Sequence, residues 1–236
     1  MVAERPTGQA GRFGPRARGP HRVVIECWRT CDTEVAQLVR PICIIPRDQV
    51  LLRARSVRAR SVADVAGVIT DLLDTWDTVA AYGIAAPQIG VNKRLFIFRP
   101  HEAASDEPPT VVINPKVIKV SGELKDYDGC LSVPGIYGET RRAERIEIMA
   151  QDVEGREVRL KFEGFTARII QHEMDHLDGV LFIDRLDSLD ELYTLREEPP
   201  AEEGGEPRMV RVPLDPAQRA LVEAGRRPLP GHALRW

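Results

Sequence analysis

The stretch QHEMDHLDG, residues 171–179, places two histidines four residues apart and a glutamate directly after the first of them. In an α-helix, positions four apart differ by only about 40° around the axis. His172 and His176 would therefore project from one face and could hold one metal ion, with Glu173 beside it. That is the geometry in which a carboxylate takes a proton from an activated water. A chance pair of histidines on a solvated helix produces the same pattern, so the motif alone leaves both interpretations open.

The residues that precede and overlap this motif predict a buried helix over 165–177. Ile169 lies three residues before His172, so the histidine face continues an apolar face. A second apolar stripe is formed by Ile170, Met174 and Leu177. A helix that is apolar on two sides is typically buried, and buried histidines need partners. The surroundings therefore favour a functional site over a surface helix.

Other segments with regular hydrophobic patterns predict an α+β fold. Residues 61–80 carry apolar side chains at helical spacing. Five further segments are apolar or alternate apolar and polar residues, as strands do: RLFIF (94–98), TVVIN (110–114), KVIKV (116–120), RIEIMAQD (145–152) and EVRLKF (157–162). A helix, then several strands, then a helix favours antiparallel sheets over alternating βαβ units.

Composition excludes several classes of protein. The chain has 236 residues, a formal net charge of −3 and 43% hydrophobic residues, which is an ordinary balance for a globular protein with a core. This charge argues against bulk electrostatic attraction to nucleic acid or to an acidic membrane. No apolar run approaches the roughly 20 residues that span a bilayer, and the Arg-, Gly- and Pro-rich N-terminus is not a secretory signal. We therefore expect a cytoplasmic protein with no membrane partner and no specific nucleic-acid partner.

Changes in composition along the chain predict three regions. Residues 1–40 form an N-terminal extension, whose first part, to about residue 22, is too rich in Gly and Pro to become ordered by itself. Residues 41–195 form the compact domain that contains the motif. Residues 196–236 begin with an acidic, Pro-rich linker, REEPPAEEGGEP, and continue as a loosely attached tail.

A catalytic metal usually has three protein ligands and one open position, so a third ligand is required. The extended zinc-protease pattern would place a histidine six residues after His176, but Phe182 occupies that position. The best candidate is Cys130 in DGCLSVPG, residues 128–135, where a Ser-Val-Pro-Gly turn can present a side chain. A thiolate with two imidazoles suits zinc or ferrous iron. A lone cysteine is more often a small core residue, so that interpretation also stays open.

A third stretch, GIAAPQIG at residues 83–90, combines small residues with a single polar side chain. A glycine and two alanines allow a ligand to lie close to the backbone. Gln88 could then donate a hydrogen bond to a developing oxyanion. Taken alone, the stretch fits a plain tight connection between a helix and a strand better than a functional site.

Together, GIAAPQIG, GCLSVPG and QHEMDHLDG resemble the motifs of the peptide deformylase family, metal hydrolases that remove the formyl group from the N-terminal methionine of new proteins. The resemblance spans roughly residues 41–189, and three ordered motifs are far more specific than one. It implies an α+β fold in which antiparallel sheets wrap around a central helix that bears the metal ligands.

The resemblance also implies roles for individual residues. It implies one divalent metal ion, Fe²⁺ in the cell, with Zn²⁺ or Ni²⁺ as substitutes. The three implied ligands are Cys130, His172 and His176. Glu173 would be the general acid and base, while the Gln88 side chain and the Leu131 backbone N–H would stabilise the oxyanion.

The implied substrate is a formyl-Met peptide or nascent chain, with the ribosome surface as a further candidate partner. We expect four residues to contact the substrate: Gly83, Ile84, Phe165 and Ile169. The last three would form the wall of the methionine pocket.

The sequence departs from the family pattern at a few positions. Ala81 and Ile84 replace a usual glycine and leucine, Asp128 replaces a usual glutamate, and Tyr137 stands where an arginine is common. The shorter Asp128 reduces the reach to a partner such as Arg142. A specialised deformylase-like protein with another N-formyl substrate therefore stays open. So do a metallopeptidase and a non-catalytic metal-binding relative, although no ligand or base is lost.

Overall fold

The computed structural model describes residues 39–104, 106–200 and 206–229. All of these belong to one compact unit, Gln37–Trp236. The expectation of disorder in the first 22 residues lies outside the described residues. No helix in the described ranges combines the length and the apolar character needed to cross a bilayer.

Five antiparallel strands form the larger sheet, in the order β1-β2-β3-β6-β7. Their bounds are β1 Gly83–Ala85, β2 Leu95–Phe98, β3 Thr110–Ser121, β6 Arg145–Gln151 and β7 Glu157–Glu163. The segments 110–114 and 116–120, expected as two strands, form the single strand β3. A register shift between Ile113 and Lys116 and a positive φ of 52° at Asn114 carry this strand through Pro115 without ending it.

The smaller sheet has the order β4-β5-β8-β9 and was not predicted from the sequence. Its strands are β4 Leu124–Cys130, β5 Val133–Arg142, β8 Tyr193–Glu198 and β9 Arg208–Pro213. The hairpin of β4 and β5 is rich in Gly and charged residues, which hides its alternating pattern. This hairpin carries the GCLSVPG motif, so Cys130 lies at the end of a paired strand.

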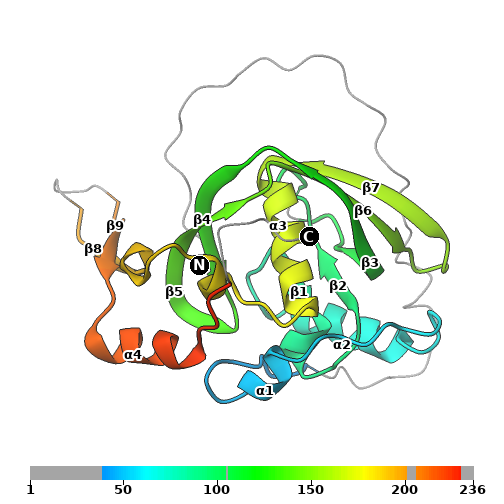
Figure 1. Cartoon of the computed structure of the whole chain (residues 1–236), viewed down its shortest axis with the longest axis horizontal. Coiled ribbons are helices and arrows are strands. Elements are labelled where there is room, and N and C mark those ends of the chain that lie inside the picture. The colour runs from blue at the N-terminus through cyan, green and yellow to red at the C-terminus, as the bar shows by residue number, and fades with distance from the viewer. Residues whose placement is uncertain (1–38, 105, 201–205, 230–236) are drawn as a thin grey trace, which may run out of the picture. The chain divides into compact units, whose positions relative to one another are not determined.

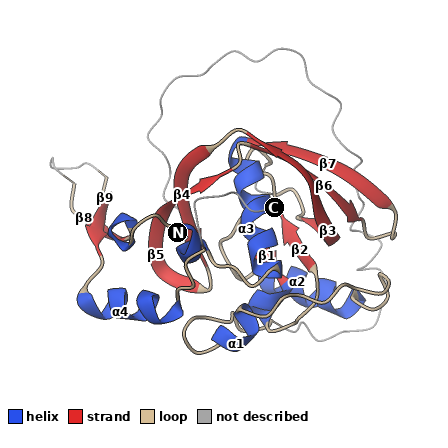
Figure 2. Cartoon of the chain, in the orientation of Figure 1, coloured by secondary structure: helices blue, strands red, loops and turns tan. Residues whose placement is uncertain are grey.

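The helix α3, Gly164–Leu177, runs between the two sheets (Figure 1). It packs against β1, β2, β6 and β7, and every residue from Thr166 to Leu177 is buried. The apolar residues between α3 and the larger sheet include Phe96, Phe98, Val112, Ile148, Ile170 and Met174. The expected α+β fold, with antiparallel sheets around a central helix, is confirmed (Figure 2).

The remaining helices are short and lie outside the sheets. They are α1 Gln49–Leu52, α2 Ala66–Trp76, α4 Pro216–Gly225 and the 3₁₀ helices η2 Ala86–Ile89, η3 Phe182–Arg185 and η4 Leu189–Glu191. The helix expected over 61–80 is α2, which ends earlier, at Trp76. It also begins later, because Ser61 and Asp64 form a separate hydrogen-bonded turn ahead of it.

The prediction of a loosely attached tail over 196–236 is wrong for residues 206–229. Strand β9 pairs with β8 along its whole length, and Val222 of α4 has no exposed surface. Gly225 lies so close to Ile45 that an added Cβ would come within 2.7 Å of its Cδ1. This segment is held by the strand pairing, by Val222 in a second apolar cluster that includes Leu52, and by Arg226, which donates to the backbone oxygens of Ile183 and Leu186.

Candidate metal centre

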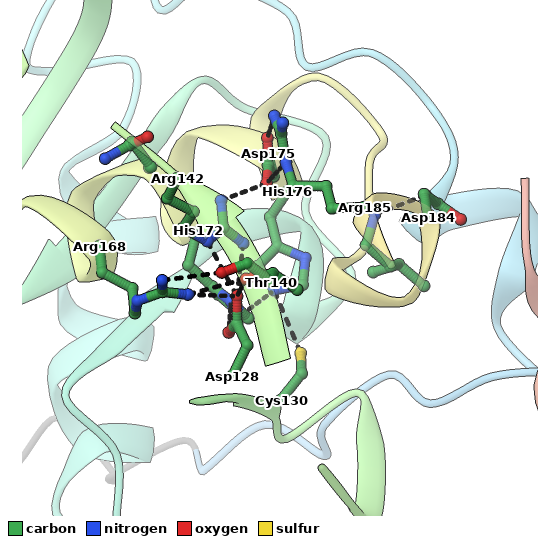
Figure 3. Close-up of polar contacts among 12 residues, drawn as sticks. Asp128, Cys130, Thr140, Arg142, Arg168, His172, Asp175, His176, Asp184 and Arg185 are labelled. Atoms are coloured by element: carbon green, nitrogen blue, oxygen red, sulfur yellow. Dashed lines mark hydrogen bonds and ion pairs between the residues drawn. The ribbon is translucent and has the colours of Figure 1, made fainter. Parts of the chain in front are cut away.

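The helix α3 and the end of β4 bring together three side chains that could hold a metal ion, Cys130, His172 and His176 (Figure 3). His172 Nε2 lies 3.2 Å from His176 Nε2, and Cys130 Sγ lies 3.3 Å from the same His176 atom. The ligand atoms of the three residues all lie within 4.8 Å of one another. A thiol and two imidazoles that converge in this way are a donor set suited to zinc or ferrous iron. The residues present therefore fit one divalent ion.

The end of β4 is shaped so that Cys130 can reach the helix. The pairing of β4 with β5 shifts register between Gly129 and Cys130. A Cβ at Gly129 would lie 2.7 Å from the ring of Tyr137, so a larger residue would push the strand away. The backbone N–H of Ser132 donates to Cys130 Sγ at 3.3 Å, which helps to fix the position of the sulfur. Leu131, between them, is partly exposed at the turn.

Glu173 is buried beside His172, and its carboxyl group lies against the backbone of β1. A Cβ added to Gly83 would overlap the Glu173 carboxyl group, so the close approach requires glycine at this position. Glu173 Oε2 has no hydrogen-bond partner among the described residues. Burial raises the pKa of Glu173 to about 7. A carboxyl group with this pKa can both accept and release a proton near neutral pH.

The side chain of Gln88 faces the same space from η2. Its Oε1 accepts a hydrogen bond from the Ala85 N–H at 2.9 Å, which fixes the orientation of the amide. Its Nε2 then lies 3.6 Å from Cys130 Sγ and 3.4 Å from Ser132 Oγ. The amide nitrogen is therefore presented towards the cluster as a donor.

The four residues expected to contact a substrate occupy different environments. Gly83 belongs to the edge strand β1. Ile169 is buried on α3 in the apolar cluster, and Ile84 has no exposed surface. Phe165 is partly buried one helical turn before Ile169.

Phe165 packs among three rings that the sequence analysis did not single out. It stacks on Tyr127 with a centroid distance of 5.4 Å, and it meets Tyr82 and His101 edge-on at 5.7 and 4.9 Å. These rings come from three separate segments of the chain, so only the fold could bring them together.

A buried network of charged groups lies behind the histidines. Asp128 Oδ1 is 2.8 Å from His172 Nδ1, and Arg142 Nε donates to Asp128 Oδ2 at 2.8 Å. The expected contact between Asp128 and Arg142 is thus made in spite of the shorter side chain. Although burial by itself raises the pKa of the Asp128 carboxyl group, Arg142 and His172 hold it well below its ordinary value.

Four other members of this network were missed in the sequence. Arg142 Nη1 donates to Asp175 at 2.7 Å, and Arg185 Nε donates to the same carboxylate at 2.6 Å. The residues missed are Thr140, Arg168, Asp175 and Arg185. Arg168 and Asp175 lie on α3. These two could have been identified from the sequence, because a charged residue on a helix that is expected to be buried needs a partner.

Residues 39–192 match the sequence profile of the polypeptide deformylase family. The chain belongs to this family. A peptide deformylase of Dehalococcoides mccartyi is 37% identical over 158 residues, which are 66% of this chain and 92% of the relative. A peptide deformylase of Thermomicrobium roseum is 41% identical over 165 residues, which are 68% of this chain and 92% of the relative.

Solved deformylase structures share the fold. The crystal structure of a peptide deformylase from Legionella pneumophila has a TM-score of 0.59 and 34% identity, and covers 64% of this chain and 88% of that one. A Synechococcus elongatus peptide deformylase in complex with actinonin also has a TM-score of 0.59, with 35% identity. The match covers 68% of this chain and 86% of that one. The resemblance seen in the three motifs is confirmed, and the metallopeptidase interpretation is set aside. Strand β9 and helix α4 lie beyond the part of the chain that matches the deformylase family.

Proposed function

We propose that this chain removes the formyl group from the N-terminal formyl-methionine of nascent polypeptides in the cytoplasm and releases formate. The observation that supports this most directly is the convergence of three ligand atoms within 4.8 Å of one another. Glu173 adjoins one of these ligands in the chain, and the Gln88 amide faces the cluster. Formyl-peptides are the proposed substrate, and the ribosome surface is a proposed partner.

We assign the metal ligands as Cys130, His172 and His176, and the ion in the cell as Fe²⁺, with Zn²⁺ and Ni²⁺ as substitutes. The softness of the donor set supports this assignment, because one thiolate and two imidazoles accept all three ions. When bound, such an ion supplies Lewis-acid chemistry: it lowers the pKa of water and polarises a carbonyl oxygen.

Glu173 is the proposed acid and base. It accepts a proton as the oxygen of water forms a bond to the formyl carbon. It returns that proton to the amine nitrogen as the C–N bond breaks, which leaves formate and a free N-terminus. Its burial and its Oε2 support this role, because that oxygen makes no hydrogen bond to any of the described residues and is free to accept a proton.

Gln88 and Leu131 are the proposed donors to the oxyanion that develops on the formyl oxygen. The Gln88 Nε2 is held by the contact of Oε1 with the Ala85 N–H, so the donor needs little reorganisation during the reaction. Leu131 directly follows Cys130, so its backbone N–H is close to the same space.

The methionine side chain of the substrate would contact Phe165 and Ile169. The backbone of the substrate would lie along Gly83 at the edge strand β1. Ile84 supports this strand from the core. The carbonyl carbon of a formyl group carries a hydrogen where other acyl groups carry carbon, so a cramped site can exclude the larger groups.

A formate-release assay tests the proposal. The protein is loaded anaerobically with Fe²⁺ and incubated with a formyl-Met peptide or with the same peptide carrying an acetyl group. Formate release from the formyl peptide, with no acetate from the other, is the expected result. Release only from formyl compounds without methionine would indicate a specialised deformylase. Stoichiometric metal binding without any turnover would indicate the non-catalytic relative instead.

A further inference from the structure

A line of hydrogen bonds leads from Arg168 to His172 (Figure 3). Arg168 Nη1 lies 2.7 Å from Thr140 Oγ1, and Thr140 Oγ1 lies 2.8 Å from Asp128 Oδ2. The other oxygen of Asp128 lies 2.8 Å from His172 Nδ1. All four side chains are buried, so water does not compete for these contacts.

The chemistry of the groups determines the direction of each hydrogen bond. A guanidinium group has only donors, so the Thr140 oxygen must accept from Arg168. The single Thr140 hydrogen is then directed at Asp128 Oδ2, which also accepts from Arg142 Nε at 2.8 Å. Asp128 Oδ2 thus accepts two hydrogen bonds, from Thr140 and from Arg142. The other oxygen, Oδ1, accepts from His172 Nδ1, because a carboxylate has no hydrogen to donate. Nδ1 therefore carries the hydrogen, and the lone pair of His172 lies on Nε2.

The position of Arg168 makes this arrangement rigid. Its Nη2 donates to the backbone oxygens of Leu124 and Thr140, both at 2.9 Å, so it ties β4 and β5 to α3. Arg168 precedes His172 by four residues, which is about one turn of the same helix. One helix face thus supplies both a metal ligand and the guanidinium that orients the carboxylate behind that ligand.

We infer that Thr140, oriented by Arg168, is a positioning residue for His172: it sets the Asp128 carboxylate so that the imidazole presents Nε2 to the metal. The inference rests on the proposed role of His172 as a ligand. Groups that orient a metal-binding histidine usually contribute a factor of about 10 to 100 in metal affinity. Here that contribution would come from a threonine two contacts away from the ligand.

The test compares two substitutions at one position. Thr140→Val removes the hydroxyl at nearly constant volume, and Thr140→Ser keeps the hydroxyl. Zn²⁺ affinity is measured by competition with a chromogenic chelator. Thr140→Val should bind about 10-fold more weakly or worse, while Thr140→Ser should stay within about 3-fold of the unchanged protein. Thr75→Val is the matched control, since Thr75 is an equally buried threonine on α2 whose hydroxyl donates to Asp71 O at 2.7 Å.

A second measurement does not depend on affinity. In the Zn²⁺-loaded protein, the His172 Nδ1 proton should give a slowly exchanging signal in ¹H–¹⁵N spectra, and Thr140→Val should speed its exchange with water. If Thr140→Val does not fold, Arg168→Lys replaces it, because lysine keeps the charge but cannot bind Thr140 and Leu124 at once. Equal Zn²⁺ affinity and unchanged exchange in these variants would overturn the inference. Failure of the unchanged protein to bind Zn²⁺ would instead overturn the ligand assignment itself.

Discussion

Replacing Gly83 by alanine would test how closely Glu173 is held against β1. The added Cβ would lie 2.6 Å from the Glu173 carboxyl carbon and 2.8 Å from Cγ, and closer still to Oε1. Ordinary contacts between such carbons are about 3.5–4.0 Å, so the carboxyl group must move by about 1 Å. It is the free end of a side chain, so it can move without unfolding the protein.

A displacement of about 1 Å at a catalytic group can cost a factor of about 100, or about 2.7 kcal/mol of transition-state stabilisation. We therefore expect Gly83→Ala to lower kcat/KM for a formyl-Met peptide by about 100-fold. The Zn²⁺ or Fe²⁺ content should stay at one ion per chain, because the three proposed ligands are untouched. The melting temperature should change little.

Gly67→Ala is the matched control for this substitution. Gly67 is exposed in the first turn of α2, and a Cβ there would meet nothing within 4 Å. Alanine at this position should leave kcat/KM unchanged and stabilise the protein by up to about 1 kcal/mol. If Gly83→Ala keeps normal turnover, Glu173 is not held at the reacting group by this contact. If the variant loses its metal, the substitution has disturbed the ligands, and the reasoning is also refuted.

Three further predictions concern the ligands, the base and the C-terminal segment. Cys130→Ala should lower metal content and turnover together, because two imidazoles alone hold a divalent ion poorly; full occupancy measured by metal analysis would remove Cys130 from the site. Glu173→Gln should keep its metal but lose about 10²- to 10⁴-fold in turnover, and metal loss in this variant would make Glu173 a ligand instead. Val222→Asp should lower the melting temperature strongly, because it puts a charge into the cluster that binds α4. Leu221→Asp, on the neighbouring and 36% exposed residue, should be nearly neutral in the same thermal scan.

The helix that carries the two proposed histidine ligands could be predicted from the sequence because its signals are local. The spacing of His172 and His176, and the apolar residues between and before them, depend only on the 3.6-residue period of a helix. That Cys130 lies near these histidines could be predicted only because three motifs resemble those of a family. No local rule links residues more than forty positions apart.

The network behind the ligands was decided by strand pairing. The register of β4 and β5 pairs Thr140 with Asp126, so the Thr140 hydroxyl can reach Asp128 two residues along β4. Arg168 of α3 donates to the backbone oxygens of Leu124 and Thr140 in the same hairpin. A shift of one residue would turn Thr140 to the other face of the sheet. Nothing in the sequence of the hairpin alone specifies which helix residue it will meet.

The attachment of the C-terminal segment, residues 206–229, was also decided by contacts with distant parts of the chain. Its composition, with many prolines and charges, predicted a loose tail, and composition measures only the average tendency of a segment to bury surface. Its attachment includes Val222 and Gly225, which pack against Ile45 and its apolar neighbours, residues far away in the chain. The sequence by itself therefore determined the helix, the proposed ligands and the proposed chemistry. Only the tertiary structure decided what lies behind the proposed ligands and what holds residues 206–229, because those contacts join segments whose proximity is a property of the whole fold.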